Sequence, residues 1–376
     1  MKGDNIKTKL LNNKLSIFLI TSYILGSSII MSIDTSLKQN SWLTLIGAAI
    51  LVIPLYLIYY RIMKLNKNKN IFEINKSLLG PVGFIFNIII IWYSLHLGAI
   101  VLRNFTEFVF MCLLNKTPII YTTILMIITT ILLLKGDIKA IGNWATLVIL
   151  IISFTVVFST LLSTSVLDLD NLLPMFNVNI EELIKSSYSV VTFPFAEVVL
   201  FLCLTNFFED NVNYKKILFI PLILSSIIFL LIAFRNLTLL GPDLMHNSAF
   251  KAVTASRVIS LGQTLTGFEA IIIVNFIFSG LAKLSVCVLA LSKGMTYLLK
   301  TSNFKNSIVP CSLLTITLSI SLYENFPQMA EFVKIYPIYA IPFQIVIPTI
   351  IWIACEIKNY KQKKLNINQP QLSLIN

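Results

Sequence analysis

The stretch VVTFPFAEVVL, from Val190 to Leu200, places one proline and one carboxylate inside a mostly apolar run. The run extends over about residues 183–208, and ~20 apolar residues suffice for an α-helix to cross a bilayer. Pro194 breaks the hydrogen bonding near the middle of that helix, and burying the charge of Glu197 there costs roughly 2.5–3.5 kcal/mol. The stretch therefore predicts a membrane helix whose interruption has a structural or functional reason.

A second apolar run, residues 16–31, carries the helix-weakening triplet Gly26, Ser27 and Ser28 near its middle. If the chain forms two successive sets of five membrane helices, each interrupted helix is the first of its set. Because five is odd, the second set then crosses the membrane in the opposite direction to the first. Inverted-repeat transporters build midplane sites from such helices, because free carbonyls bind cations and free amides bind carboxylates. The alternative is that Pro194 only kinks its helix and Gly26 only permits close packing, and the residues fit both equally well.

The composition is typical of a chain embedded in lipid. Of 376 residues, 56% are hydrophobic and 12% are charged, and the mean hydropathy is +0.84, which a water-soluble surface would not tolerate. Lipid offers the backbone no hydrogen-bond partners, and the runs lack the alternation of barrel strands, so we expect an all-α fold of about ten transmembrane helices. The ten stretches cover approximately residues 16–31, 42–60, 82–102, 119–134, 144–162, 183–208, 217–234, 268–291, 308–322 and 335–357.

The net charge of +12 is the excess of 29 Lys and Arg over 17 Asp and Glu residues, and most of the positive residues fall on one side of the predicted bundle. This distribution follows the positive-inside rule for a multi-pass protein with both termini cytoplasmic, and we expect no nucleic-acid partner. The prediction is a single membrane domain over residues 1–376, with a cytoplasmic N-terminus (1–14), a ten-helix bundle (15–357) and an unstructured cytoplasmic tail (358–376).

The largest predicted outer connection spans residues 235–266, and its middle, 248–265, is compatible with a short helix over the outer mouth, as a lid or a passive loop. The five cysteines have no CxxC spacing, and the two histidines are too few for a metal centre. No HExxH, P-loop or Gly-x-Ser-x-Gly motif occurs. We therefore expect no metal, no cofactor and no enzymatic activity.

Four short segments, in order and spacing, resemble the B-subunit family of endospore germinant receptors, the permease-like subunits of the GerAB/GerKB type. They are QNSWL at 39–43, LNKTP at 114–118, FPFAE at 193–197 followed by Phe201 and Leu202, and the segment from FEA at 268–270 to KLS at 283–285. The chain departs from the family pattern at Asn115, where proline is frequent, and at Ala196, where glycine is frequent. It also has no proline after Gly26.

The resemblance implies the amino-acid/polyamine/organocation transporter fold, a LeuT-like 5+5 inverted repeat with the first and sixth helices interrupted. It further implies residence in the inner membrane of the spore and nutrient sensing together with an A subunit and a lipoprotein C subunit. A small germinant, such as an amino acid, would bind within the lipid-embedded bundle.

The residues at the two interruptions, together with two residues of the third helix, are the candidates for ligand binding. Glu197 would line a ligand pocket or an ion path, or make a structural hydrogen bond across the bundle. Tyr93 and His96 share one helix face that could look into the pocket, although a lone membrane histidine is usually structural. The full set is Gly26, Ser27, Ser28, Tyr93, His96, Thr192, Phe193, Pro194, Phe195, Ala196 and Glu197.

Lys283, Ser285, Arg103 and Glu107 are candidates for an ion path or gate. Lys283 lies too deep in the eighth helix to reach the membrane surface easily. In transporters of the related fold a sodium ion bridges the first and eighth helices, and the Lys283 ammonium could take its place near Gly26. Alternatively, Lys283 is neutral or forms a structural salt bridge, for example with Glu197. Arg103 and Glu107 are four residues apart and could pair at the outer mouth, where a gate would be well placed; direct contact with the ligand is the alternative.

The leading hypothesis is a ligand-sensing receptor subunit in which a nutrient binds between the broken helices and shifts a conformational equilibrium. An amino-acid or cation permease that transports its ligand is the first alternative. The second is a membrane scaffold for a partner subunit, in which case pocket substitutions would leave the nutrient response unchanged.

Overall fold

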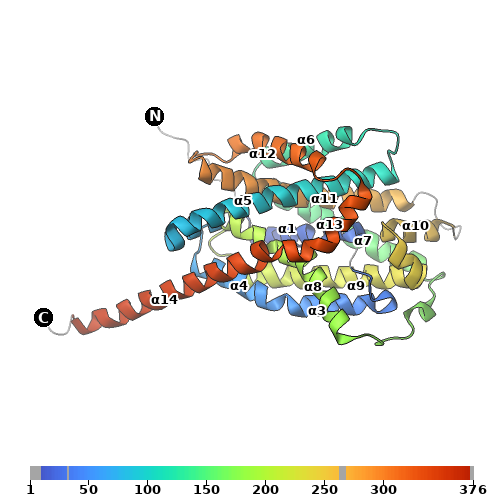
Figure 1. The fold of residues 1–376 in the computed structure, drawn as a ribbon, viewed down its shortest axis with the longest axis horizontal. Coiled ribbons are helices and arrows are strands. Elements are labelled where there is room, and N and C mark those ends of the chain that lie inside the picture. Colours follow the sequence, from blue (N-terminus) through green and yellow to red (C-terminus); the bar gives the residue numbers. More distant parts are fainter. Residues whose placement is uncertain (1–9, 32–33, 262–267, 373–376) are drawn as a thin grey trace.

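The computed structural model describes residues 10–31, 34–261 and 268–372, and almost all of them are helical (Figure 1). The longer elements are α1 (Asn13–Leu25), α2 (Ser28–Met31), α3 (Ser41–Leu51), α4 (Ile53–Leu65), α5 (Ile71–Cys112), α6 (Ile119–Lys135), α7 (Ile138–Ser163), α8 (Ile180–Val190), η3 (Val191–Phe195), η4 (Ala196–Phe207), α9 (Tyr214–Asn247), α10 (Lys251–Leu261), α11 (Phe268–Leu298), α12 (Lys305–Ser321), α13 (Phe326–Tyr339), η5 (Pro342–Val346) and α14 (Ile347–Leu372). Two short 3₁₀ turns, η1 (Lys38–Asn40) and η2 (Leu169–Leu172), lie in connections.

Each of the ten predicted apolar stretches coincides with helical structure. Seven helical segments in the described part of the chain are long and apolar enough to cross a membrane, and the count of ten spans stays a prediction. The seven are Lys38–Leu65, Ile71–Cys112, Ile138–Ser163, Ile180–Phe207, Tyr214–Asn247, Glu269–Leu298 and Phe326–Leu365.

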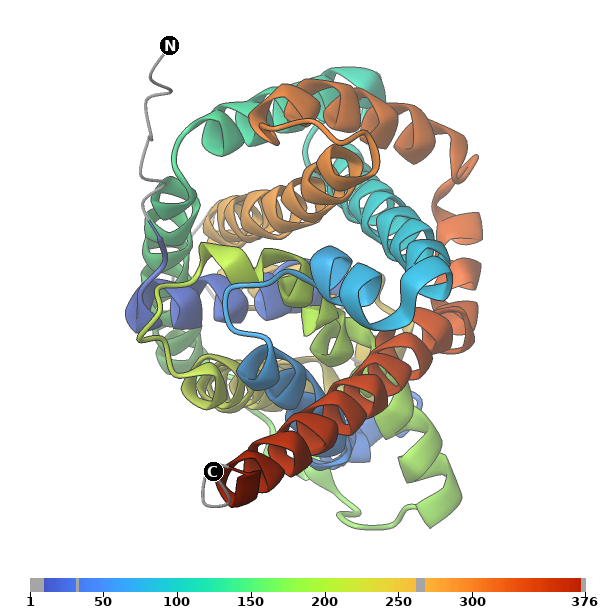
Figure 2. The ribbon, with the colours of Figure 1, turned by 90° about the vertical axis from the view of Figure 1, so that its left-hand side faces the viewer.

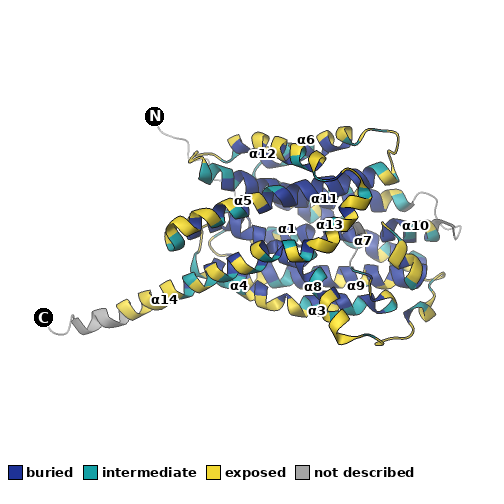
Figure 3. Ribbon diagram, in the orientation of Figure 1, coloured by how far each residue is buried: buried dark blue, intermediate teal, exposed yellow. Residues whose placement is uncertain are grey.

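The two most buried of these segments, Ile180–Phe207 and Glu269–Leu298, form the centre of the bundle together with α1. Figure 3 shows this centre in dark blue, whereas α3, α6, α12 and α14 turn exposed faces outward. The outward faces are apolar, as Ile50 of α3, Leu132 of α6 and Leu313 of α12 are 61%, 67% and 57% exposed. Such faces suit a lipid solvent, in which apolar side chains need not be buried against protein.

The helix α5 packs along α11 through the middle of the bundle, and the contact depends on a small residue. A Cβ atom at Gly280 of α11 would overlap the ring of Phe105 in α5. Figure 2 shows the bundle from one end, with α14 crossing in front of the other helices.

The outer connection after the seventh stretch differs from the expectation. Helix α9 does not end near residue 234 but runs to Asn247, with a break at Gly241, where φ is 70° and Pro242 follows. Arg235, expected in an outer loop, is therefore a helical residue and only 3% exposed. The short helix expected in this connection exists as α10, which packs on α9, α11 and α2. Residues 262–267 lie outside the described part.

The C-terminal segment also differs, because α14 continues as a helix to Leu372 where an unstructured tail was expected after Ile357. Figure 1 shows this helix projecting from the bundle. Residues 358–369 include several lysines, glutamines and a leucine, which favour helix, and contain neither glycine nor proline; Pro370 lies in the last turn. Residues 1–9 of the expected N-terminal segment and residues 373–376 of the tail lie outside the described residues.

Candidate functional site

The first interruption separates α1 from α2 at Gly26, whose backbone angles, φ 2° and ψ −112°, are not helical. A Cβ atom at this position would lie 2.5 Å from Cδ of Lys283 and 2.9 Å from the carbonyl oxygen of Tyr23. The carbonyl oxygen of Gly26 accepts a hydrogen bond from the Ser279 hydroxyl (3.0 Å). Glycine is therefore required here because the side chains of α11 approach the backbone so closely.

The second interruption lies between α8 and η4, where Phe193 has φ −136° and ψ 108°. Tyrosine hydroxyls contact the backbone just beyond this break. Tyr56 donates to Phe195 O (3.1 Å) and Tyr23 to Glu197 O (3.2 Å). Tyr59 donates to Gln344 O (2.6 Å), and its oxygen also lies 3.4 Å from Ala196 O. The start of η4 is thus anchored to α1 and α4 in this conformation.

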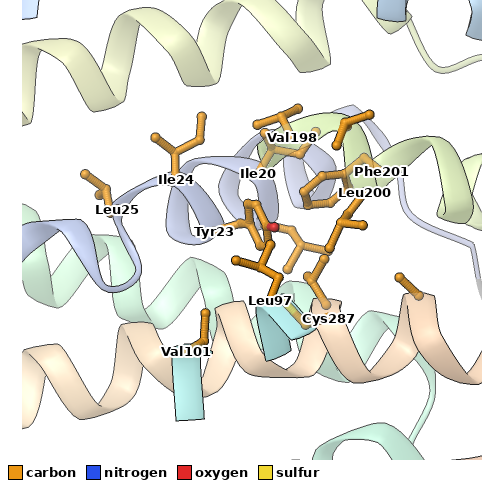
Figure 4. Close-up of a cluster of buried hydrophobic side chains, with 14 of the residues drawn as sticks. Ile20, Tyr23, Ile24, Leu25, Leu97, Val101, Val198, Leu200, Phe201 and Cys287 are labelled. Atoms are coloured by element: carbon orange, nitrogen blue, oxygen red, sulfur yellow. The ribbon is translucent and has the colours of Figure 1, made fainter. Parts of the chain in front are cut away.

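Tyr23 belongs to α1, so its bond to the backbone of Glu197 ties the two interrupted helices together. Figure 4 shows the Tyr23 ring enclosed by apolar side chains that include Leu97, Phe201 and Cys287. The Tyr23 and Phe201 rings meet edge to face, with centroids 5.3 Å apart. The enclosure holds the hydroxyl in one position.

Glu197 and Lys283 form an ion pair between the two interruptions. The Nζ–Oε2 distance is 2.5 Å, and both side chains are fully buried. Tyr336 donates to the other carboxylate oxygen (2.8 Å), and Lys283 Nζ also donates to the Ser27 hydroxyl (3.3 Å). The pair cancels two charges that would each be costly alone in the membrane, and it links η4 to α11 and to the end of α1.

The ion pair continues into a chain of hydrogen bonds. Nε2 of Gln344 donates to the Tyr93 hydroxyl (2.8 Å), which lies 3.1 Å from the Tyr336 hydroxyl. Since Tyr336 donates to Glu197, this order requires Tyr93 to donate to Tyr336. Gln344 Nε2 also donates to Thr192 O (2.9 Å). The network therefore joins both interruptions to α5, α13 and η5.

A cavity of about 560 Å³ reaches this network from the end of the molecule opposite to the projecting α14. Glu197, Tyr336 and Val190 are buried and form its floor, whereas the exposed Lys185, His246 and Lys334 lie at its mouth. The wall between them is mainly apolar, with Leu97, Ile100, Val101, Phe193, Met329 and Phe332. Such a cavity fits a small molecule with an apolar portion and a polar group that meets the carboxylate.

Two of the predicted ligand residues, Phe193 and Glu197, line the cavity. Gly26 and Ser27 lie behind the ion pair against Lys283, and Ser28 borders a separate small cavity. Tyr93 belongs to the hydrogen-bond network. The remaining residues of the predicted set, Thr192, Pro194, Phe195, Ala196 and His96, do not line it in this conformation.

His96 stacks on Trp92, with centroids 5.5 Å apart, and its ring meets the edge of Tyr339. The Ser285 hydroxyl donates to Leu281 O of its own helix (2.6 Å). Arg103 and Glu107 pair as expected, with Nη2 and Oε1 2.6 Å apart and both side chains buried. Neighbouring Asn104 lines the cavity, whereas a gating role for the pair stays a prediction.

Several residues of the site were not anticipated, above all Tyr336, Gln344, Tyr23 and Ser279. Gln344 carried a usable signal, since it is the only side-chain amide in the apolar stretch 335–357 and follows Pro342 closely. The tyrosines carried none, because membrane helices use tyrosine for many purposes.

Residues 10–329 match the family model described as spore germination protein. The chain belongs to the spore germination protein family. The resemblance seen in the four short segments is thereby confirmed. One relative is spore germination protein KB of Bacillus subtilis (strain 168), which is 24% identical over 352 residues, or 92% of this chain and 94% of that protein.

Two solved structures share the fold of this spore germination family member. A Na⁺-coupled sialic acid symporter, in a substrate-bound outward-open state, aligns with a TM-score of 0.65 at 13% identity and covers 89% of this chain and 77% of that chain. MhsT in complex with L-phenylalanine aligns with a TM-score of 0.61 at 12% identity and covers 93% of this chain and 89% of that chain. Both are transporters of the LeuT fold, which confirms the predicted fold class. Family and fold are those of membrane-embedded transporters or receptors.

Proposed function

We propose that this chain is the permease-like, nutrient-sensing membrane subunit of a spore germinant receptor. A small germinant, an amino acid, binds between the two interrupted helices at the floor of the outer cavity. The observation that carries the proposal is that this cavity ends on the Glu197 carboxylate, the group that links both interruptions through Lys283.

The ion pair suggests how binding would be converted into a signal. The ammonium group of an amino acid can replace the Lys283 ammonium on Glu197, while the apolar side chain of the ligand contacts Leu97, Val101 and Phe332. Lys283 would then lose its contact with the Glu197 carboxylate and keep the Ser27 hydroxyl as its polar contact. Because the pair holds α11 against both interruptions, its exchange would favour a different arrangement of these helices, which is a population shift.

The proposed setting is the inner membrane of the spore, with both termini cytoplasmic. The proposed partners are the A subunit and the lipoprotein C subunit of the receptor, as the family resemblance implies. A change in the arrangement of the bundle would reach these partners, or release ions, and so trigger germination.

The test is the germination dose-response of spores that carry Lys283→Met or Glu197→Gln, across a panel of amino acids, with protein abundance checked by immunoblot. We expect Glu197→Gln to raise the half-saturating concentration by about tenfold or more, since it removes the charged acceptor of the ligand ammonium. Lys283→Met removes the competing ammonium and should lower the half-saturating concentration, and responses are compared at matched abundance because this variant also loses stability. The matched control is Lys293→Met, on the same helix but outside this cavity. An unchanged dose-response in both site variants would indicate that another subunit recognises the nutrient and that this chain is a membrane scaffold.

A second candidate function, transport of the ligand, is favoured by the fold, which is shared with a Na⁺-coupled symporter. Uptake of labelled amino acids into proteoliposomes that contain only this chain separates the two. Accumulation that depends on an ion gradient would establish a permease, whereas saturable binding without uptake supports the receptor.

A further inference from the structure

Arg235 is a buried cation whose side-chain hydrogen bonds all go to neutral groups. It lies in α9 and is 3% exposed. Nη1 donates to the Ser159 hydroxyl (2.5 Å), and Nε and Nη2 donate to Oδ1 of Asn236 (3.2 and 2.8 Å). Within the described part of the chain, no carboxylate lies within ion-pair distance of this guanidinium.

Two other buried cations in the described bundle form ion pairs. Lys283 is paired with Glu197, and Arg103 with Glu107. A buried charge without a counter-charge is strongly unfavourable in a membrane protein, and hydrogen bonds to neutral groups compensate it only in part. The Arg235 guanidinium therefore calls for a negative charge that the described side chains do not supply.

A cavity of about 20 Å³, lined by buried residues, lies beside Arg235. It exceeds the roughly 10–15 Å³ that one water-sized sphere needs, but it is too small for a polyatomic anion such as phosphate or a carboxylate. Thr155 of α7 and Asn275 of α11 also line it and are only 5% and 4% exposed. Thr155 Oγ1 and Asn275 Oδ1 have no hydrogen-bond partner among the described residues. The cavity thus combines a guanidinium with two buried polar groups that lack partners.

We propose that this cavity binds a chloride ion. Chloride is monatomic and only a little larger than water, so it matches the space, and its charge matches the cation. The Thr155 hydroxyl can donate to it, and so can the Asn275 amide after rotation, because the amide nitrogen and oxygen occupy nearly equivalent positions. Asn236 and Ser159 hold the guanidinium in place.

The position of the site gives it a consequence for the outer half of the bundle. Besides α7, α9 and α11, its walls include Ile29 of α2 and Ala252 of α10. Ile29 belongs to the short helix that follows the first interruption, and Ala252 belongs to the helix of the outer connection. Bound chloride therefore stabilises the packing of α2 and α10 on the bundle.

The experiment uses the purified full-length protein in detergent, with the unfolding temperature measured in sodium chloride and in sodium gluconate of equal ionic strength. Gluconate is too large for the cavity. A ligand that binds only the folded state raises stability with concentration, so we expect the unfolding temperature to rise saturably with chloride and not with gluconate. Equilibrium dialysis with radioactive chloride measures the binding directly.

Two variants assign the effect to this cavity. Arg235→Gln removes the cation and should abolish the chloride response. Thr155→Val keeps the shape of the side chain and removes one hydrogen-bond donor, so we expect about tenfold weaker chloride binding. This variant tests the site even if Arg235→Gln fails to fold. The matched controls, Arg257→Gln on the exposed side of α10 and Thr160→Val on α7, should respond as the original protein does.

Two results would overturn the proposal. If the original protein is equally stable in chloride and gluconate and binds no radioactive chloride, the cavity holds water and the cation is tolerated without an anion. If chloride stabilises the original protein and both cavity variants to the same extent, the ion acts elsewhere on the molecule.

Discussion

At the scale of single residues, Glu197 and Lys283 decide the properties of the site, because each is tolerable in the membrane only in the presence of the other. Breaking a buried pair from one side leaves an uncompensated charge, which typically costs about 3–5 kcal/mol, whereas replacing both partners is often close to neutral. The two residues should therefore be strongly coupled in stability.

A double-mutant cycle measures this coupling. We expect Lys283→Met alone to lower the unfolding temperature of the purified protein strongly, and Glu197→Gln alone to lower it less, since its amide can still bond Tyr336. The double variant Glu197→Gln/Lys283→Met should be more stable than Lys283→Met. Strictly additive losses would contradict the pair as it stands in the structure.

Gly26 provides a second residue-scale prediction. In Gly26→Ala the added methyl group would lie 2.5 Å from Cδ of Lys283, so the lysine must move away from Glu197. We expect the germination response to shift to higher nutrient concentrations at reduced protein abundance. The control is Gly98→Ala, whose methyl group would meet Cys287 Cβ at 3.3 Å and needs only a small adjustment. Equal behaviour of the two variants would speak against close contact at Gly26.

Residue identities within the site were partly predictable, but their partners were not. Proline and carboxylate in an apolar run identify Phe193 and Glu197, both of which line the cavity. The pairing of Glu197 with Lys283 was one of several alternatives, because the two lie 86 positions apart in the chain and only the packing of η4 on α11 brings them together. The same holds for Tyr336 and Gln344, which reach the site from the last apolar stretch.

At the scale of elements, α10 is the part of the outer connection whose chemistry responds to pH. Burial lowers the pKa of Lys251 in this helix to about 8, and Asp34 opposes the shift. The unfolded chain keeps the ordinary lysine pKa of ~10.4. Between these two values the unfolded state binds more protons than the folded state, so stability increases with pH.

The prediction is a rise of a few degrees in unfolding temperature from about pH 8 to about pH 10. Lys251→Met should flatten this part of the profile, because it removes the titrating group. The exposed Lys334, changed to Met, is the control and should leave the profile unchanged. A profile that keeps its slope in Lys251→Met would assign the dependence to another group.

The positions of the helices followed from hydropathy, but their ends did not. Apolar runs mark only the lipid-facing length of a helix, so the polar continuations of α9 to Asn247 and α14 to Leu372 were missed. The helical segment from Ile71 to the break at Gly80, where φ is 54°, was missed for the same reason, although Asn70 and Glu73 form a capping box at its start. The predicted start near residue 82 directly follows this break. Capping residues in polar segments are the signal that could have corrected these boundaries.

At the scale of the whole molecule, the arrangement predicts which surfaces face the two sides of the membrane. A cysteine introduced at Gln362 of α14 should react only with reagents that enter the cytoplasm, and one at Glu182 of α8 only with reagents outside. The native cysteines are replaced first, since Cys112 is partly exposed. Labelling of both positions from the same side would contradict the odd number of spans expected between Glu182 and Gln362, and with it the cytoplasmic tail.

The ion pair also determines how the proposed sensor would respond to voltage. Moving one elementary charge across a membrane is worth about 2.3 kcal/mol per 100 mV. The affinity of a site whose net charge changes on ligand binding therefore depends on the membrane potential. Glu197 and Lys283 cancel each other, and an amino acid is itself neutral overall as a zwitterion. Its entry to the floor of the cavity would leave the net charge there unchanged, and recognition would proceed equally well in an energised and in a fully depolarised membrane.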